Sequence, residues 1–123
     1  MNSLLKNTSS FSIKNWNQDD RPREKLLTKG KTALSDSELI AILISSGNRE
    51  ESAVALSKRI LAGAENNLNK LGKMGVKELM DFKGIGEAKA VAIVAALELG
   101  RRRSGEEGLR QKKITSSKSV FEL

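Results

Sequence analysis

Residues 79–90 read LMDFKGIGEAKA, and this stretch decides the fold of the chain. It places an apolar helical pattern, a tight Gly84-Ile85-Gly86 turn and the start of a second apolar helical pattern in close succession. Two glycines permit positive φ angles and the close approach of another backbone or a ligand. We expect Ile85 to insert into the core between them and to hold the shape of the turn. The second helix begins at the turn with unpaired amides, which form a potential anion site.

This arrangement is the pattern of a helix-hairpin-helix motif, which we place at about residues 76–100. The motif is typical of modules that hold DNA phosphates without reading base sequence. The amides of Gly86, Glu87 and Ala88 would contact the phosphate, and Lys89, one turn into the helix, would add positive charge. The alternative is that the Gly-x-Gly turn only joins two helices. It is not a dinucleotide fingerprint, because no strand precedes it and Lys89 stands where the third glycine would be.

Outward from this motif, apolar spacing predicts further short helices joined by glycine turns. Pro22 suits the first turn of a helix that Gly30 ends. A capping box of Ser35 and Glu38 opens a helix that we expect Gly47 to end. The other expected helices are Ser52 to Ala62 with Gly63 as its stop, a short segment opened by Asn66-Asn67, a segment from Val76 after Gly75, and a last helix from about Gly86 to about Arg103. The predicted fold class is all-α, a compact bundle of five or six short helices that contains the helix-hairpin-helix motif.

The last predicted helix is apolar on nearly all sides, which is typical of a buried central helix. One expected core face consists of Ala88, Val91, Ala92, Ala95 and Leu99, and Ile93, Val94 and Leu97 cover much of the remainder. Gly105 and Gly108 indicate a linker after this helix.

Composition excludes several kinds of site. The 123 residues suit one domain, and the chain has no histidine and no cysteine, which rules out zinc sites, histidine-based triads, cysteine nucleophiles and disulfides within it. Its longest apolar run, residues 90–97, is far shorter than the roughly 20 residues of a membrane span. We therefore expect a cytoplasmic protein without a membrane partner, catalytic residue, metal or cofactor of its own.

The formal charge of +7 indicates a nucleic-acid partner, but the charge is unevenly placed. Residues 1–31 hold seven Lys/Arg against three Asp/Glu, and residues 100–123 hold the same numbers, so each flank has a net charge of +4. Residues 32–99 hold eight against nine, a net charge of −1. The densest cluster, residues 101–103, fits a solvated helix end and phosphate contact equally well. Lys58 and Arg59 fit a solvated helix face.

Several separate motifs occur in the order found in one known family. They are RPREKLLTKG (21–30), ALSDSELIAILISSG (33–47), SAVALSKRIL (52–61) and ELMDFKGIGEAKAVAIVAALELGRRR (78–103). Over residues 21–103 the chain thereby resembles the N-terminal domain of the RadC-like (UPF0758) family of bacterial DNA repair-associated proteins. The resemblance implies an all-helical domain with a helix-hairpin-helix element. Residues 1–20 have no periodic apolar pattern and many Ser and Asn, which predicts a flexible lead-in before this domain.

In that family a JAB/MPN-type metallopeptidase-like domain follows, with zinc held by a His-x-His…Asp pattern. This chain has no histidine, so we interpret residues 104–123 as a linker and the truncated start of an absent domain. Zinc is expected only in that domain.

The first functional hypothesis is a DNA-binding module that is not sequence-specific and that positions the absent domain. The candidate binding residues are Lys83, Gly84, Ile85, Gly86, Lys89, Arg101, Arg102 and Arg103. The charge of Glu87 opposes this hypothesis, because it lies where a phosphate would approach. The alternative is a scaffold domain that packs on its own C-terminal domain or on another protein. The sequence leaves open the preferred DNA structure and the oligomeric state.

Overall fold

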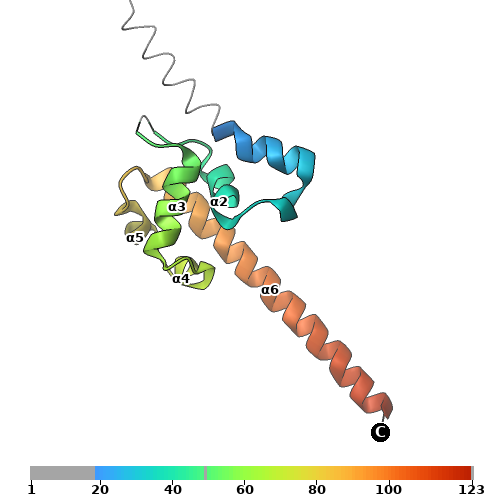
Figure 1. The fold of residues 1–123 in the computed structure, drawn as a ribbon. Helices are drawn as coiled ribbons and strands as arrows, with labels where there is room; N and C mark the ends of the chain where they lie inside the picture. Colours follow the sequence, from blue (N-terminus) through green and yellow to red (C-terminus); the bar gives the residue numbers. More distant parts are fainter. Residues whose placement is uncertain (1–18, 49, 123) are drawn as a thin grey trace, which may run out of the picture.

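The computed structural model describes residues 19–48 and 50–122, and the secondary structure of these residues is entirely helical (Figure 1). Residues 19–29 form the first helical segment. The elements that follow are a 3-10 turn η1 (Lys31–Ala33), α2 (Asp36–Ile44), α3 (Ala53–Gly63), α4 (Leu68–Gly72), α5 (Val76–Met80) and α6 (Glu87–Glu122). The prediction of an all-α fold is confirmed. Most of the expected lead-in lies outside the described residues, and residues 19 and 20 are already helical.

Helices α2, α3 and α4 each begin after a residue whose side chain caps the helix. Ser35 Oγ accepts from the amide of Glu38, and Glu38 Oε1 accepts from the amide of Ser35 at 3.0 Å, so the predicted capping box forms. Lys25 Nζ lies 3.1 Å from the same carboxylate and ties segment 19–29 to α2. The backbone bond from Ser35, followed by the bond from Lys25, lowers the pKa of Glu38 below its ordinary value. The side chains of Ser52 and Asn67 cap α3 and α4 in the same way.

Two expected helix ends are wrong. Helix α2 ends at Ile44, where Ser45 adopts a φ of 70°, and not at Gly47. Helix α6 does not stop near Arg103 but continues to Glu122 through the stretch expected to be an irregular linker. A glycine costs a helix only about 1 kcal/mol relative to alanine. Gly105 and Gly108 stand among strong helix formers, so two glycines do not break the helix. The predicted domain division at this place remains a prediction.

The core lies between α2 and α3, which pack together, and the first turns of α6, which contact α2, α4 and α5 (Figure 1). It is aliphatic, as the shortage of aromatic residues requires. Its buried members are Ile40, Ala41, Ile44, Ala53, Leu56, Ile60, Leu61, Ala64, Leu71, Leu79, Ile85, Ala90 and Ile93. Beyond this core, α6 runs outward, and its C-terminal end lies far from the other helices in Figure 1.

The expectation that this helix is buried on nearly all sides is wrong. Ala90 and Ile93 are fully buried and Leu97 is partly buried, whereas Val91 is 47% exposed and Leu99 67% exposed. The apolar residues of this helix surround it almost completely, so their spacing cannot select one face. Which face of α6 is buried depends on α2, α4 and α5, which contact only one side of the helix.

Asp19 links the first helical segment to the centre of the fold. Its Oδ1 accepts from the amide of Ala53 at 2.6 Å, and its Oδ2 accepts from the amide of Gly47 at 3.1 Å. The side chain is buried, and Ala53 is the first residue of α3. One carboxylate therefore satisfies an amide at the positive end of a helix and an amide of the loop before it.

We predict that Asp19→Ala lowers the free energy of unfolding by about 2 kcal/mol, because a buried amide and a partly buried amide lose a charged acceptor. The measurement is urea unfolding followed by circular dichroism.

The matched control is Asp20→Ala, which removes the same charge from a half-buried neighbour and should change stability by less than about 0.5 kcal/mol. Equal losses in the two variants would contradict the assignment of these two hydrogen bonds.

Candidate nucleic-acid interface

The turn at residues 81–86 joins α5 to α6 and has a defined shape. The amide of Ile85 donates to the carbonyl of Phe82 at 3.1 Å, and the Ile85 side chain is only 5% exposed. Gly84 has a φ of 94°, a conformation that residues with a side chain rarely adopt. Gly86 does not have a positive φ, so only one of the two glycines uses this freedom. The expectation that Ile85 inserts into the core is confirmed.

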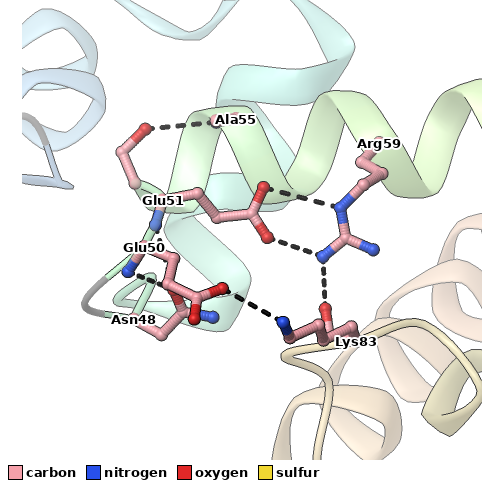
Figure 2. A network of polar contacts seen from close by, with 7 residues as sticks. Asn48, Glu50, Glu51, Ala55, Arg59 and Lys83 are labelled. Atoms are coloured by element: carbon pink, nitrogen blue, oxygen red, sulfur yellow. Dashed lines mark hydrogen bonds and ion pairs between the residues drawn. The ribbon is translucent and has the colours of Figure 1, made fainter.

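The side chain of Arg59, on α3, contacts the backbone of the turn (Figure 2). Its Nη2 donates to the carbonyl of Lys83 and also to Glu51 Oε1, the latter at 2.6 Å. The bond to Glu51 raises the pKa of Arg59 above its ordinary value. Our interpretation of Arg59 as part of a solvated helix face is therefore wrong, because its guanidinium bridges two segments.

Phe82 supplies a second anchor between the turn and α3. A Cβ placed on Gly63 would lie 2.5 Å from Cζ of the Phe82 ring, so the ring packs against bare backbone at the end of α3. Together with the burial of Ile85 and the Arg59 bridge, this contact fixes the turn from its inner side. On the outer side, Gly84 and Gly86 are both exposed.

Among the residues that the structure describes, no side chain caps the first amides of α6. Helix α6 begins directly after Gly86, whose carbonyl accepts from the amide of Ala90 at 3.1 Å. Glycine has no side chain that could cap the helix. Within the described residues the amides of Gly86, Glu87 and Ala88 have no acceptor, so they remain available to an anion.

The charges around the turn are mixed. Lys83 Nζ lies 3.2 Å from Glu50, but both side chains are largely exposed, so this ion pair is weak and readily exchanged (Figure 2). Lys89 is half-buried and lies one turn into α6. Glu87 is exposed at the first position of the helix. The two lysines favour an anion and the glutamates oppose it.

The arginine cluster at residues 101–103 lies elsewhere. It stands about 15 residues along α6 from Gly86, which at 1.5 Å per residue is roughly 20 Å. Because the helix continues past it, the cluster does not mark a helix end. Arg101 and Arg102 both donate to Glu98 at 2.9 Å. The bond from Arg101, followed by the bond from Arg102, lowers the pKa of Glu98 to about 2. The candidate residues therefore form two separate groups.

A groove of about 530 Å³ runs between α4 and α6 beside the first of these arginines. Leu68, Lys73, Leu97 and Arg101 are among the residues that line it. Its lining is neither strongly basic nor closed, and we assign it no ligand.

Sequence reasoning missed Arg59 and Asp19. Each acts on a partner 24 to 34 residues away in the chain. Ion pairs and caps can be recognised at spacings of three or four residues, but no local pattern signals these distant contacts.

Other kinds of site find no support in the part of the chain that the structure describes. It contains no group of three or more acidic side chains placed to hold a metal ion. None of its helices combines the length and the apolar character that crossing a membrane requires.

The two glycines of the turn should differ sharply in their tolerance of a side chain. We predict that Gly84→Ala destabilises the fold by about 1–3 kcal/mol, because the backbone has a positive φ. The new Cβ would also lie 2.9 Å from Nδ2 of Asn48, whose Oδ1 is held by the amides of Glu50 and Glu51. Thermal and urea unfolding measure the loss.

Gly86→Ala is the matched control, since a Cβ there has no atom within 4 Å and φ is not positive. It should leave stability within about 0.5 kcal/mol of the parent chain. A tolerated Gly84→Ala would mean that the turn is not held in this shape.

Comparison with known proteins places these features in a family. The family model described as UPF0758 N-terminal matches residues 13–91. A UPF0758 protein of Flavobacterium johnsoniae is 68% identical over 115 residues, which cover 94% of this chain and 50% of the relative. One of Porphyromonas gingivalis is 44% identical over 112 residues, covering 90% and 49%. One of Geobacillus kaustophilus is 50% identical over 93 residues, covering 76% and 41%.

The chain thus spans about half the length of the curated relatives it matches. No solved structure matches it. The family match covers segment 19–29, all of α2 to α5, the turn and the first residues of α6. By this match, and in agreement with the resemblance seen in its motifs, the chain belongs to the UPF0758 family.

Proposed function

We propose that this chain is a DNA-binding module that holds phosphates at the turn between α5 and α6 without reading base sequence. In the full-length polypeptide it would position the other half on DNA. The observation that carries the proposal is a turn fixed from its inner side and bare on its outer side. Ile85, Phe82 and Arg59 hold it, while Gly84 and Gly86 offer exposed backbone beside the open amides of α6.

The physical basis is preorganisation. A turn that is already rigid loses little conformational entropy when a ligand binds. Backbone amides and a helix N-terminus recognise phosphate oxygens, which are the same for every base. Lys83 and Lys89 add positive charge on the two sides of the turn. The exposed Lys83–Glu50 pair can open so that the ammonium group reaches a phosphate.

The same electrostatics set an upper limit on affinity. Glu50, Glu51 and Glu87 lie close to the turn, and residues 32–99 carry a net charge of −1 from eight basic and nine acidic side chains. We therefore expect weak binding that involves few phosphates and depends steeply on salt. The arginine cluster could add a second contact along α6 but does not belong to the turn.

We assign no reaction to this chain, which contains neither histidine nor cysteine. Any catalysis by the full-length protein, including zinc chemistry and a part in DNA repair, belongs in this proposal to the other half.

A scaffold function is the second candidate. The observation that favours it is the exposure of Val91 and Leu99 on a helix that carries few charges between residues 88 and 97. In this alternative the turn is only structural, and DNA binding is absent.

The test is fluorescence anisotropy of labelled duplex, single-stranded and forked DNA at several salt concentrations. We predict that duplex affinity falls with a log–log slope of about −0.9 for each phosphate contacted. Gly86→Ala should weaken binding about tenfold without loss of stability, because its methyl group projects into the space that the phosphate would occupy. Lys89→Glu should weaken it at least as much.

The matched control is Lys29→Glu, the same charge reversal at the end of segment 19–29, which Figure 1 shows on the opposite side of α2 and α3 from α5. It should have a much smaller effect than Lys89→Glu. Loss of binding only when Arg101, Arg102 and Arg103 are changed to glutamine would move the site to the middle of α6. Absence of binding to all three DNAs would refute the proposal and favour the scaffold function.

A further inference from the structure

Helix α6 carries apolar side chains on two opposite faces between residues 88 and 99. The inner face consists of Ala90, Ile93, Val94 and Leu97, which are buried or half-buried against α2, α4 and α5. The outer stripe consists of Ala88, Val91, Ala95 and Leu99, all of them exposed. At 100° per residue, these four side chains centre on the side of the helix opposite Ala90 and Ile93.

Such an outer face is unusual for a helix at the edge of a bundle, which normally presents charged or polar residues to water. Between residues 88 and 97 the only charged side chain is Lys89, which does not lie on the stripe. Val91 and Leu99 are 47% and 67% exposed. The sequence thus has the pattern of a helix covered on all sides, whereas the described residues cover one side.

We infer that the outer stripe is the docking surface for the other half of the family polypeptide. The curated relatives are about twice as long as the aligned region, and the family model that matches here is the N-terminal one. Each relative therefore possesses roughly as much chain again. Docking of this additional half along the stripe would bury Val91 and Leu99 and make α6 the central helix shared by both halves.

The size of the stripe favours a tethered partner over a second copy of this chain. A stable complex between free proteins buries about 800 Å² on each partner. Two alanines, a valine and a leucine on one helix face supply much less. A covalently connected half needs less contact area, because its effective concentration beside the stripe is in the millimolar range.

The test uses the absence of cysteine from this chain. Val91→Cys and Leu99→Cys are made separately, both in the 123-residue chain and in a full-length family polypeptide that carries this sequence. The rate of maleimide labelling of each site is followed by peptide mass spectrometry. We expect labelling in the full-length polypeptide to be at least about tenfold slower than in the 123-residue chain, since thiol reactivity follows exposure.

Leu27→Cys is the control, because Leu27 is 85% exposed and lies in segment 19–29, away from α6. Its labelling should be equal in the two proteins. Equal rates for Val91→Cys and Leu99→Cys in both proteins would overturn the inference. Protection already present in the 123-residue chain and increasing with its concentration would also overturn it, in favour of self-association. None of these variants alters residues 83–86, so the outcome is independent of DNA binding at the turn.

Discussion

The contact between Arg59 and the turn at residues 81–86 ties α3 to the start of α6. The guanidinium group donates both to Glu51, which precedes α3, and to the carbonyl of Lys83. This bridge, the Phe82 ring against Gly63 and the buried side chain of Ile85 join the turn to α3 and to the core. Past the turn, Ala90 and Ile93 are fully buried on the side of α6 that contacts α2, α4 and α5.

The proposed DNA contact and the proposed docking surface use different parts of the structure. The outer side of the turn offers backbone amides and two lysines, whereas the outer stripe of α6 offers apolar area. A module of this kind could hold DNA at the turn and another half of the polypeptide along α6 at the same time.

The chain's local signals predicted most of the fold. Ser35 with Glu38, Ser52 and Asn67 cap the helices as their side chains indicate, and Gly30 ends the first segment. Cap recognition succeeds because both partners lie within four residues of each other. The predicted end of α2 is wrong because Gly47 resembles a helix stop, whereas its amide donates to Asp19, 28 residues earlier.

The sequence by itself determined that the fold is helical, where α2 to α6 begin, that Ile85 is buried, and that histidine and cysteine chemistry is impossible within this chain. These properties depend on residue identity and on neighbours a few positions apart. Only the tertiary structure decided that Arg59 holds the turn, that Asp19 caps α3, that the arginine cluster lies far from Gly86, and which face of α6 is covered. The physical reason is that these contacts join distant segments, so their partners are chosen by packing in space and not by spacing along the chain.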